Sequence, residues 1–216
     1  MKNIISSTLL VLTFLIGCSE NAKVLNGNKE VEFTKIDSST GQFFYKNELY
    51  TGKYEQYHDN GHLWVKGSYR YGKKHGIWEY FHNNGKLSAK GAYSYGSEEG
   101  IWKKYHENGQ LFTKGTYVNG IDNGDWVRYY DNGILAIKCS FLNGILYGLY
   151  ESYHENGKIS IKCSYFNGKE DGVWKRYYEN GYLESKGIFL KGEMIGLWES
   201  YNEDGTLKEK VNHSLE

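Results

Sequence analysis

Histidine, cysteine and carboxylate side chains recur in this sequence at a fixed spacing, and such residues can bind metals, form disulfides or transfer protons. Four histidines stand one interval or a multiple of it apart: His58, His82, His106 and His154. Acidic residues follow the same interval: Glu107, Asp131, Glu155 and Glu179. Two cysteines, Cys139 and Cys163, are also one interval apart. The distance that this interval spans in space decides which of these chemistries can occur.

If each interval adds two β-strands, equivalent residues lie ~10 Å apart. Zn–N bonds of ~2.0–2.1 Å require ligands crowded around one ion, and a disulfide needs Cα atoms ~4.4–6.8 Å apart. We therefore expect surface histidines and free, half-buried thiols. The acids could nearly meet the ~5–9.5 Å between glycosidase carboxylates, but they precede exposed turns without a cleft. The sequence predicts no metal, no cofactor and no enzymatic activity.

The interval is a 24-residue unit that occurs seven times without insertion or deletion. Each unit begins with a glycine: Gly52, Gly76, Gly100, Gly124, Gly148, Gly172 and Gly196. Two positions later comes an aromatic residue: Tyr54, Trp78, Trp102, Trp126, Tyr150, Trp174 and Trp198. Repeats of this length are typical of stacked arrays, in which each unit shares its core only with its neighbours.

Each unit predicts one β-hairpin. In residues 76–99, Asn84-Gly85 separates two runs rich in aromatic and aliphatic residues. Asn-Gly favours a two-residue type I′ turn, which needs φ > 0 at both central positions. The equivalent turn glycines are Gly85, Gly109, Gly133, Gly157 and Gly181. The predicted fold is all-β: an elongated, open antiparallel meander of stacked hairpins, one per repeat.

The two-residue turn also predicts a register, with Trp78 opposite Gly91 and Glu79 opposite Lys90. An indole lying across a strand glycine covers exposed backbone, so a structural role is expected for Trp78, Trp102, Trp126, Trp174 and Trp198. Alternation places Trp78, Tyr80 and Leu87 on a core face. The opposite face then carries a tyrosine ladder and a lysine ladder: Tyr105, Tyr129, Tyr153 and Tyr177 with Lys114, Lys138 and Lys162. Expected ion pairs are Glu79–Lys90, Glu151–Lys162 and Glu199–Lys210.

The first residues lie outside the array. Lys2 precedes a mostly apolar run at residues 4–16, which is typical of a secretory signal and shorter than the ~20 residues that span a bilayer. It ends in Leu15-Ile16-Gly17-Cys18, which resembles the bacterial lipobox, whose cysteine is lipidated. We predict a lipoprotein signal peptide at 1–17, a tether and N-terminal cap at 18–41, and the array at 42–211. The array comprises a half-repeat, six full repeats and a truncated last repeat, and a polar tail follows at 212–216.

The charge and aromatic content limit the choice of partner. The chain has 26 basic and 26 acidic residues, whereas a nucleic-acid binder usually shows a basic footprint. Binding of anionic lipid headgroups would also need a basic excess. Tyrosine is the outstanding enrichment, at 21 residues, and it is favoured at protein interfaces. We expect no nucleic-acid partner, and contact with a membrane through the Cys18 anchor only.

The repeat closely resembles a known family. Residues 172–187 read G-V-W-K-R-Y-Y-E-N-G-Y-L-E-S-K-G, which is similar to the bacterial variant of the MORN repeat. The pattern G-x-W-x-x-Y-x-x-N-G-x-L-x-x-K-G covers residues 52–211, with departures at Tyr54, Asp125, Cys139, Tyr150 and Cys163. Chains of this type often carry the name YwqK-family antitoxin. The resemblance implies a β-hairpin array that acts in protein or membrane association without chemistry of its own.

These observations favour a surface-anchored, non-enzymatic protein-binding or scaffold module in a bacterial cell envelope. Its partner would bind the lysine and tyrosine ladders of the central repeats. One alternative is a cell-envelope glycan-binding module, since aromatic hairpin repeats also occur in cell-wall-binding domains. Another is an antitoxin-like neutralising protein, which would require an exported toxin as partner.

Overall fold

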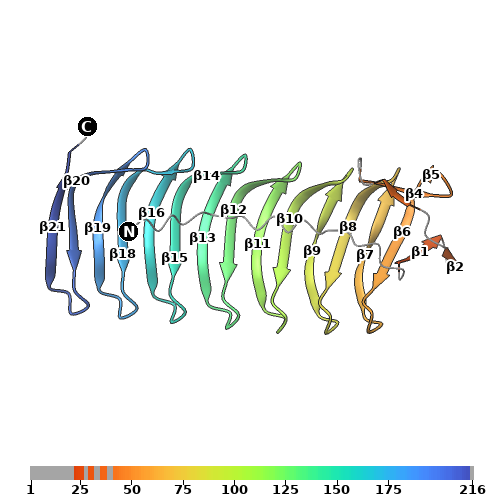
Figure 1. Ribbon diagram of the computed structural model, residues 1–216, viewed down its shortest axis with the longest axis horizontal. Coiled ribbons are helices and arrows are strands. Elements are labelled where there is room, and N and C mark those ends of the chain that lie inside the picture. The colour runs from red at the N-terminus through yellow and green to blue at the C-terminus, as the bar shows by residue number, and fades with distance from the viewer. Residues whose placement is uncertain (1–21, 27–28, 32–34, 38–40, 215–216) are drawn as a thin grey trace.

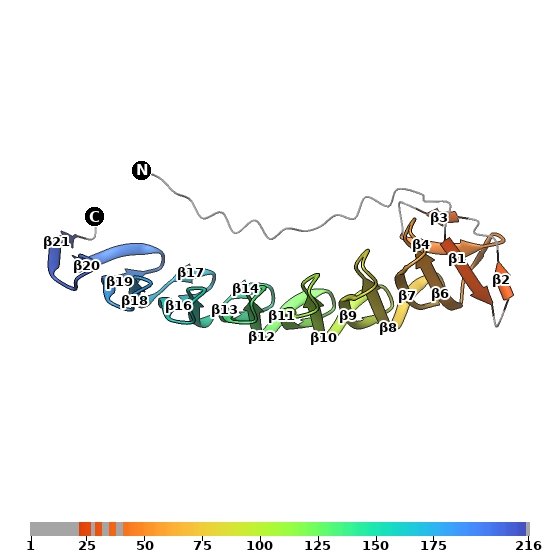
Figure 2. The same ribbon diagram turned by 90° about the horizontal axis from the view of Figure 1, so that it is seen from below.

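The computed structural model describes residues 22–26, 29–31, 35–37 and 41–214. The predicted signal peptide and Cys18 lie outside these residues. The described chain forms one long antiparallel sheet, a single layer of hairpins side by side, with a small second sheet at the N-terminal end (Figures 1 and 2). The predicted all-β meander is therefore confirmed. No helix capable of crossing a membrane occurs in the part of the chain that is described.

Seven hairpins make up the array. Their strands are β6 (Gly52–Tyr57) with β7 (Leu63–Arg70), β8 (Lys73–Phe81) with β9 (Leu87–Ser94), β10 (Ser97–Tyr105) with β11 (Leu111–Val118), β12 (Ile121–Tyr129) with β13 (Leu135–Leu142), β15 (Gly148–Tyr153) with β16 (Ile159–Phe166), β18 (Gly172–Tyr177) with β19 (Leu183–Leu190), and β20 (Glu193–Tyr201) with β21 (Leu207–His213). The short strands β14 (Ile145–Leu146) and β17 (Lys169–Glu170) precede β15 and β18. Successive hairpins pair edge to edge, which makes the sheet continuous.

The turn within each hairpin differs from the prediction. The N–H of His82 donates to the carbonyl of Lys86 (2.8 Å), and the N–H of Gly85 donates to the carbonyl of His82 (2.9 Å). Among the described residues of this loop, only Gly85 has a positive φ, at 79°. This geometry is a three-residue loop, in which a type I turn precedes a left-handed glycine. The predicted type I′ turn at Asn84-Gly85 is therefore wrong. These loops form the lower edge in Figure 1, which we call the asparagine edge.

The type I′ turns lie at the opposite edge, between hairpins. Tyr95 and Gly96 both have positive φ values, 48° and 98°, and Ser94 pairs with Ser97 across them. The equivalent turns are Tyr71-Gly72, Asn119-Gly120, Asn143-Gly144, Asn167-Gly168 and Lys191-Gly192. We call this upper edge of Figure 1 the type I′ edge.

A bulge beside the asparagine edge restores the predicted register farther along the hairpin. Tyr80 pairs with Ala89 but Phe81 pairs with Leu87, so the strand passes over one residue. Trp78 therefore faces Gly91, and Glu79 faces Lys90, as predicted. Leu87 is a correction: it shares the face of Phe81 and not the core face, because directly paired residues point to the same side.

A second bulge decides which glycine each indole covers. Between the pairs Glu99–Ala92 and Lys103–Lys90, three residues of β10 face the single residue Gly91. Trp102 consequently lies on Gly91, where an added Cβ would overlap its indole. Trp78, Trp126 and Trp198 cover Gly67, Gly115 and Gly187 in the same way. The indole thus covers the strand glycine of the preceding hairpin, and not the glycine of its own hairpin as predicted.

Aromatic rings fill the core face along the array. Tyr93 packs edge-on against Trp102 at 5.1 Å between ring centroids, and Phe189 packs against Trp198 at 5.0 Å. Such edge-to-face pairs are favourable beyond the area that they bury. Trp78 and Trp102 are only 1% and 5% exposed. The core is therefore a row of rings shared between neighbouring hairpins.

The N-terminal segment closes one end of this row. The strands β3 (Lys35–Asp37), β4 (Gln42–Tyr45) and β5 (Glu48–Leu49) form the second sheet, whose Phe43 stacks on Tyr69 at 4.7 Å. The strand β1 (Ala22–Asn26) pairs with β6 and with β2 (Lys29–Val31). Residues 22–26, predicted to lie in the tether and N-terminal cap at 18–41, therefore form a strand that extends the main sheet. At the other end, β21 pairs with β20.

Candidate binding face

The histidine and asparagine rows join neighbouring hairpins at the asparagine edge. His82 Nε2 lies 2.9 Å from the carbonyl oxygen of Tyr105, which can only accept a hydrogen bond. Asn84 Oδ1 accepts from the N–H of Lys86 at 3.0 Å, and its Nδ2 donates to the carbonyl of Glu107 at 2.9 Å. The acidic residues before the turns thus supply backbone carbonyls to this ladder. Both rows have a structural role.

Tyrosine replaces histidine in two repeats and makes the same bond. The hydroxyl of Tyr130 donates to the carbonyl of Tyr153 at 2.7 Å, and that of Tyr178 to Tyr201 at 2.8 Å. The position requires a donor that can reach the next hairpin, and histidine and tyrosine both meet that requirement. Within the described residues, no three His, Cys, Asp or Glu side chains gather as a metal site.

The two cysteines are free and buried. Burial raises the pKa of Cys139 to about 11 and that of Cys163 to about 12. Both thiols are therefore neutral, whereas the thiolate is the nucleophilic form. The aromatic residues eleven positions later are Tyr150 and Trp174, at the places where an indole covers glycine elsewhere. The cysteines are packing residues at glycine positions.

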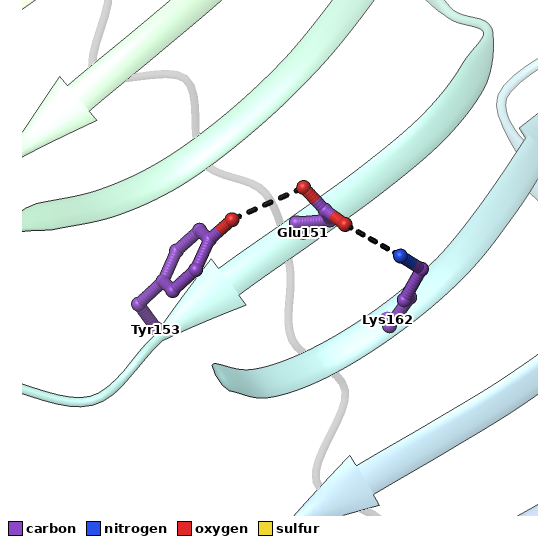
Figure 3. Close-up of polar contacts among 3 residues, drawn as sticks. All are labelled: Glu151, Tyr153 and Lys162. Atoms are coloured by element: carbon purple, nitrogen blue, oxygen red, sulfur yellow. Dashed lines mark hydrogen bonds and ion pairs between the residues drawn. The ribbon is translucent and has the colours of Figure 1, made fainter. Parts of the chain in front are cut away.

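The structure gathers the predicted tyrosines and lysines along one face. Tyr105, Tyr129, Tyr153 and Tyr177 are half-buried, and Lys114, Lys138 and Lys162 are exposed. We call this set the lysine–tyrosine face. In one repeat, Glu151 links the two ladders: Lys162 Nζ lies 2.8 Å from Glu151 Oε1, and the hydroxyl of Tyr153 donates to Oε2 at 3.1 Å (Figure 3).

Glutamates neutralise the lysine ladder toward both ends of the array. Glu79 pairs with Lys66 and Lys90, each at 2.7 Å. Glu199 pairs with Lys186 at 2.7 Å and with Lys210 at 2.6 Å. The three predicted ion pairs are confirmed. Hydrogen bonds from Lys186, Lys210 and Tyr201 lower the pKa of Glu199 to about 2, so its carboxylate remains ionised.

The centre of the face lacks this neutralisation. The positions equivalent to Glu79 hold Lys103, Val127 and Lys175 in other repeats. Lys103 pairs in register with Lys90 on one side and Lys114 on the other. In the described part of the chain, no ion pair joins Lys103 or Lys114 to a carboxylate. Positive charge is therefore uncompensated between β10 and β11.

An exposed aliphatic row borders the lysine–tyrosine face. Its members stand directly before the core aromatic residue of each unit and are 46–58% exposed: Ile77, Ile101, Leu149, Val173 and Leu197. Asp125 interrupts the row and accepts a hydrogen bond from Ser140 Oγ at 2.7 Å. The predicted binding residues did not include this row. The sequence signal for this row is the aliphatic residue that stands between the first glycine and the core aromatic residue of most units.

Comparison with known families agrees with this architecture. The family described as the MORN repeat variant matches seven stretches, which together cover more than half of the chain: residues 50–71, 74–94, 98–119, 122–143, 146–167, 170–191 and 194–214. The chain belongs to the MORN repeat variant family. No curated protein matches it. In MORN terms, each stretch contains one asparagine-edge loop, and the first six end at or next to a type I′ turn.

Two hollows of this MORN array lie at the asparagine edge, between successive loops. One of about 460 Å³ is lined by residues that include His154, Arg176, Tyr178 and Glu184. Two of these residues, Arg176 and Glu184, form an ion pair at 2.9 Å. His154 and Tyr178 bond carbonyls of the next hairpin. The polar groups here are engaged in holding the repeats together.

Proposed function

We propose that this MORN array is a non-enzymatic scaffold that holds a partner protein on the central part of the lysine–tyrosine face. The proposal rests on the contrast between neutralised and uncompensated lysines along the lysine ladder. Glu79 and Glu199 neutralise two lysines each near the ends, whereas Lys103 and Lys114 face each other across β10 and β11. A partner with acidic side chains would supply the missing charge, and complementary charge favours specific association.

The face also offers area and anchors. Four repeats span roughly 30 Å along the sheet, which leaves room for the ~800 Å² per partner of a standard interface. Tyr105 and Tyr129 are half-buried, so little rotamer freedom remains to be lost on binding. Binding energy usually concentrates in a few such aromatic residues. Ile101, 55% exposed, adds apolar contact beside them.

We further propose that Cys18 is lipidated and holds the protein in a bacterial cell envelope. The motif Leu15-Ile16-Gly17-Cys18 after an apolar run supports this location. Fractionation of cells that express Cys18→Ala tests it. We expect the variant to leave the membrane fraction, and retention to the same extent would rule out the anchor.

Co-purification from the native envelope tests the binding face. Tyr129→Ala with Tyr153→Ala should abolish capture of the partner, and so should Lys103→Glu with Lys114→Glu. The matched controls are Asp131→Asn with Glu155→Gln at the loops, and Lys208→Glu at the far end, all of which should bind normally. Capture that survives both face variants would move the site elsewhere. Loss of glycan binding instead of protein capture would favour the glycan-binding alternative.

A further inference from the structure

Large apolar side chains are exposed at the type I′ edge of the central hairpins. Val118 and Ile121 form a cross-strand pair around one turn, and Leu142 and Ile145 form the next pair. Their exposed fractions are 40%, 49%, 53% and 49%. Neither pair belongs to the ring core. By strand alternation, Val118 and Leu142 lie on the same side of the sheet as Lys114 and Lys138, four residues farther toward the type I′ edge.

The apolar side chains form one continuous patch. Ile121 lies beside the glycine of the following turn, where its Cγ2 would be 3.2 Å from a Cβ added at Gly144, and Ile145 lies beside Gly168 in the same way at 3.3 Å. Tyr147 and Phe166 extend the contact, with ring centroids 6.0 Å apart. We call these six residues the edge patch: Val118, Ile121, Leu142, Ile145, Tyr147 and Phe166.

The fold does not require apolar residues at these positions. The pairs equivalent to Val118 and Ile121 are Arg70 with Lys73 and Ser94 with Ser97 in the first two type I′ turns. Lys73 lies over Gly96 much as Ile121 lies over Gly144. Charged and polar side chains therefore build the same turn. The fold alone therefore does not explain why the central hairpins carry apolar residues at these positions.

The size of the patch suggests an interface. Six large side chains, each about half exposed, present on the order of 500 Å² of apolar surface, toward the upper end of the ~300–600 Å² found as the largest patch on typical monomers. Ser94 and Ser97 border it at one end. At the other end, Lys169 pairs with Phe166, and Glu193 pairs with Leu190, which is itself 40% exposed. Burial of such a patch is favourable at roughly 25 cal/mol per Å².

We propose that the edge patch joins two copies of this chain in an antiparallel dimer. Most homodimers pair the same surface of both subunits around a twofold axis. The row that contains Ile121 and Ile145 begins at Lys73 and ends at Glu193. Antiparallel packing brings Lys73 of one copy toward Glu193 of the other. Parallel packing would place Lys73 beside Lys73, and like charges disfavour that arrangement.

The length of the row fits a stable interface. Lys73 and Glu193 are five repeats apart in the sequence, which corresponds to roughly 50 Å along the sheet. Contact along that length can reach the ~800 Å² per partner of a specific complex. The edge patch lies on the same side of the sheet as the lysine ladder, four residues farther along β11 and β13, and the dimer does not rest on the scaffold function.

Light scattering after size-exclusion chromatography tests the dimer on the full, detergent-solubilised chain. The protein mass of the wild type should be twice the mass of one chain. Leu142→Ser with Ile145→Ser copies the pair found at Ser94 and Ser97, and it should weaken dimerisation at least tenfold. The control, Ile77→Ser with Val173→Ser, removes side chains that are 57% and 58% exposed elsewhere, and it should remain dimeric.

A charge exchange tests the antiparallel orientation. Lys73→Glu alone and Glu193→Lys alone should each weaken the dimer several-fold, and the double variant should restore it. Failure of the double variant to restore dimerisation overturns the antiparallel arrangement. A monomeric wild type, or a patch variant that dimerises normally, overturns the dimer itself. A different protein or a lipid surface on the edge patch would give the monomeric result.

Discussion

At the scale of single residues, the left-handed glycine of each loop is the most constrained position of the hairpin. Gly133 has a φ of 83°, and a Cβ there would lie 2.7 Å from Gln110 Oε1, at the end of a flexible side chain. The backbone angle is therefore the main obstacle to substitution, because a β-branched residue rarely adopts φ > 0.

We expect Gly133→Val to lower the free energy of unfolding by more than ~1 kcal/mol. Gly133→Asn is the matched control, because asparagine tolerates the left-handed region better than other side chains, and it should cost less. Thermal or urea denaturation measures both. Equal stability of Gly133→Val and wild type would contradict the left-handed loop.

Glu199 makes stability depend on pH. Its carboxylate accepts hydrogen bonds from Lys186, Lys210 and Tyr201, which lower its pKa from 4.5 to about 2. A depressed carboxyl pKa stabilises the fold above the unfolded value, and this contribution disappears as pH falls through the folded value.

Glu199→Gln should therefore melt below wild type near neutral pH, and the difference should shrink between pH 4.5 and about 2. Because both lysines are exposed, added salt should also reduce the difference. Melting temperatures across this pH range provide the measurement. A difference that is independent of pH would assign the effect to packing instead of charge.

At the scale of the elements, the asparagine ladder explains one exception in the repeat. Asn156 accepts a hydrogen bond from the N–H of Lys158 and donates one to the carbonyl of Glu179. Asp204 holds the same place in the last hairpin and accepts from the N–H of Thr206 at 2.9 Å. In the part of the chain that is described, no hairpin lies beside this loop on its outer side, so there is no carbonyl for an amide to donate to.

We expect Asn156→Asp to destabilise the array by about 1 kcal/mol, because it removes a donor and leaves a carboxylate near a carbonyl oxygen. Asp204→Asn should be nearly neutral. Urea denaturation of the two variants separates the roles of acceptor and donor. Equal effects would show that the contact between hairpins adds nothing to stability.

The sequence predicted the hairpins and their register in mid-strand, but not the edges. Asn84-Gly85 is compatible with a type I′ turn and with a type I turn before a left-handed glycine, and these differ by one residue. The bulge between Phe81 and Tyr80 cancels that difference. The predicted pairing of Trp78 and Glu79 is therefore correct, although the predicted turn type is wrong. A second Asn-Gly row, including Asn143-Gly144, marked the real type I′ edge.

The residues that make up the lysine–tyrosine face were easier to predict than the core contacts. Its tyrosines and lysines were assigned by alternation, and the predicted ion pairs form. The three-against-one bulge at Gly100 arises from pairing between hairpins, which no local pattern encodes. This bulge places each indole on the strand glycine of the preceding hairpin. The uncompensated charge at Lys103 was readable from the sequence by comparing it with Glu79, one repeat earlier.

At the scale of the whole molecule, the array is one-dimensional. Each hairpin pairs with its neighbours along the sheet (Figure 1), and in such arrays stability is approximately a sum of repeat and interface contributions. Removal of one whole 24-residue unit should therefore leave every remaining residue with equivalent neighbours. Deletion of a whole unit can therefore test partner binding while the rest of the array stays folded.

We expect deletion of residues 98–121 and deletion of residues 170–193 to give shortened, cooperatively folded arrays, each ~10 Å shorter by small-angle scattering. The first deletion removes Lys103 and Lys114 and should abolish capture of the partner. The second removes Lys175, whose in-register partners Lys162 and Lys186 are both neutralised by glutamate. It also removes Tyr177, the last tyrosine of the ladder, but leaves the central tyrosines in place, so capture should persist. Each deletion thus controls for the other in length and strand number. Loss of cooperative unfolding in both would contradict the modular array, whereas equal capture by both would place the partner away from the centre of the lysine–tyrosine face.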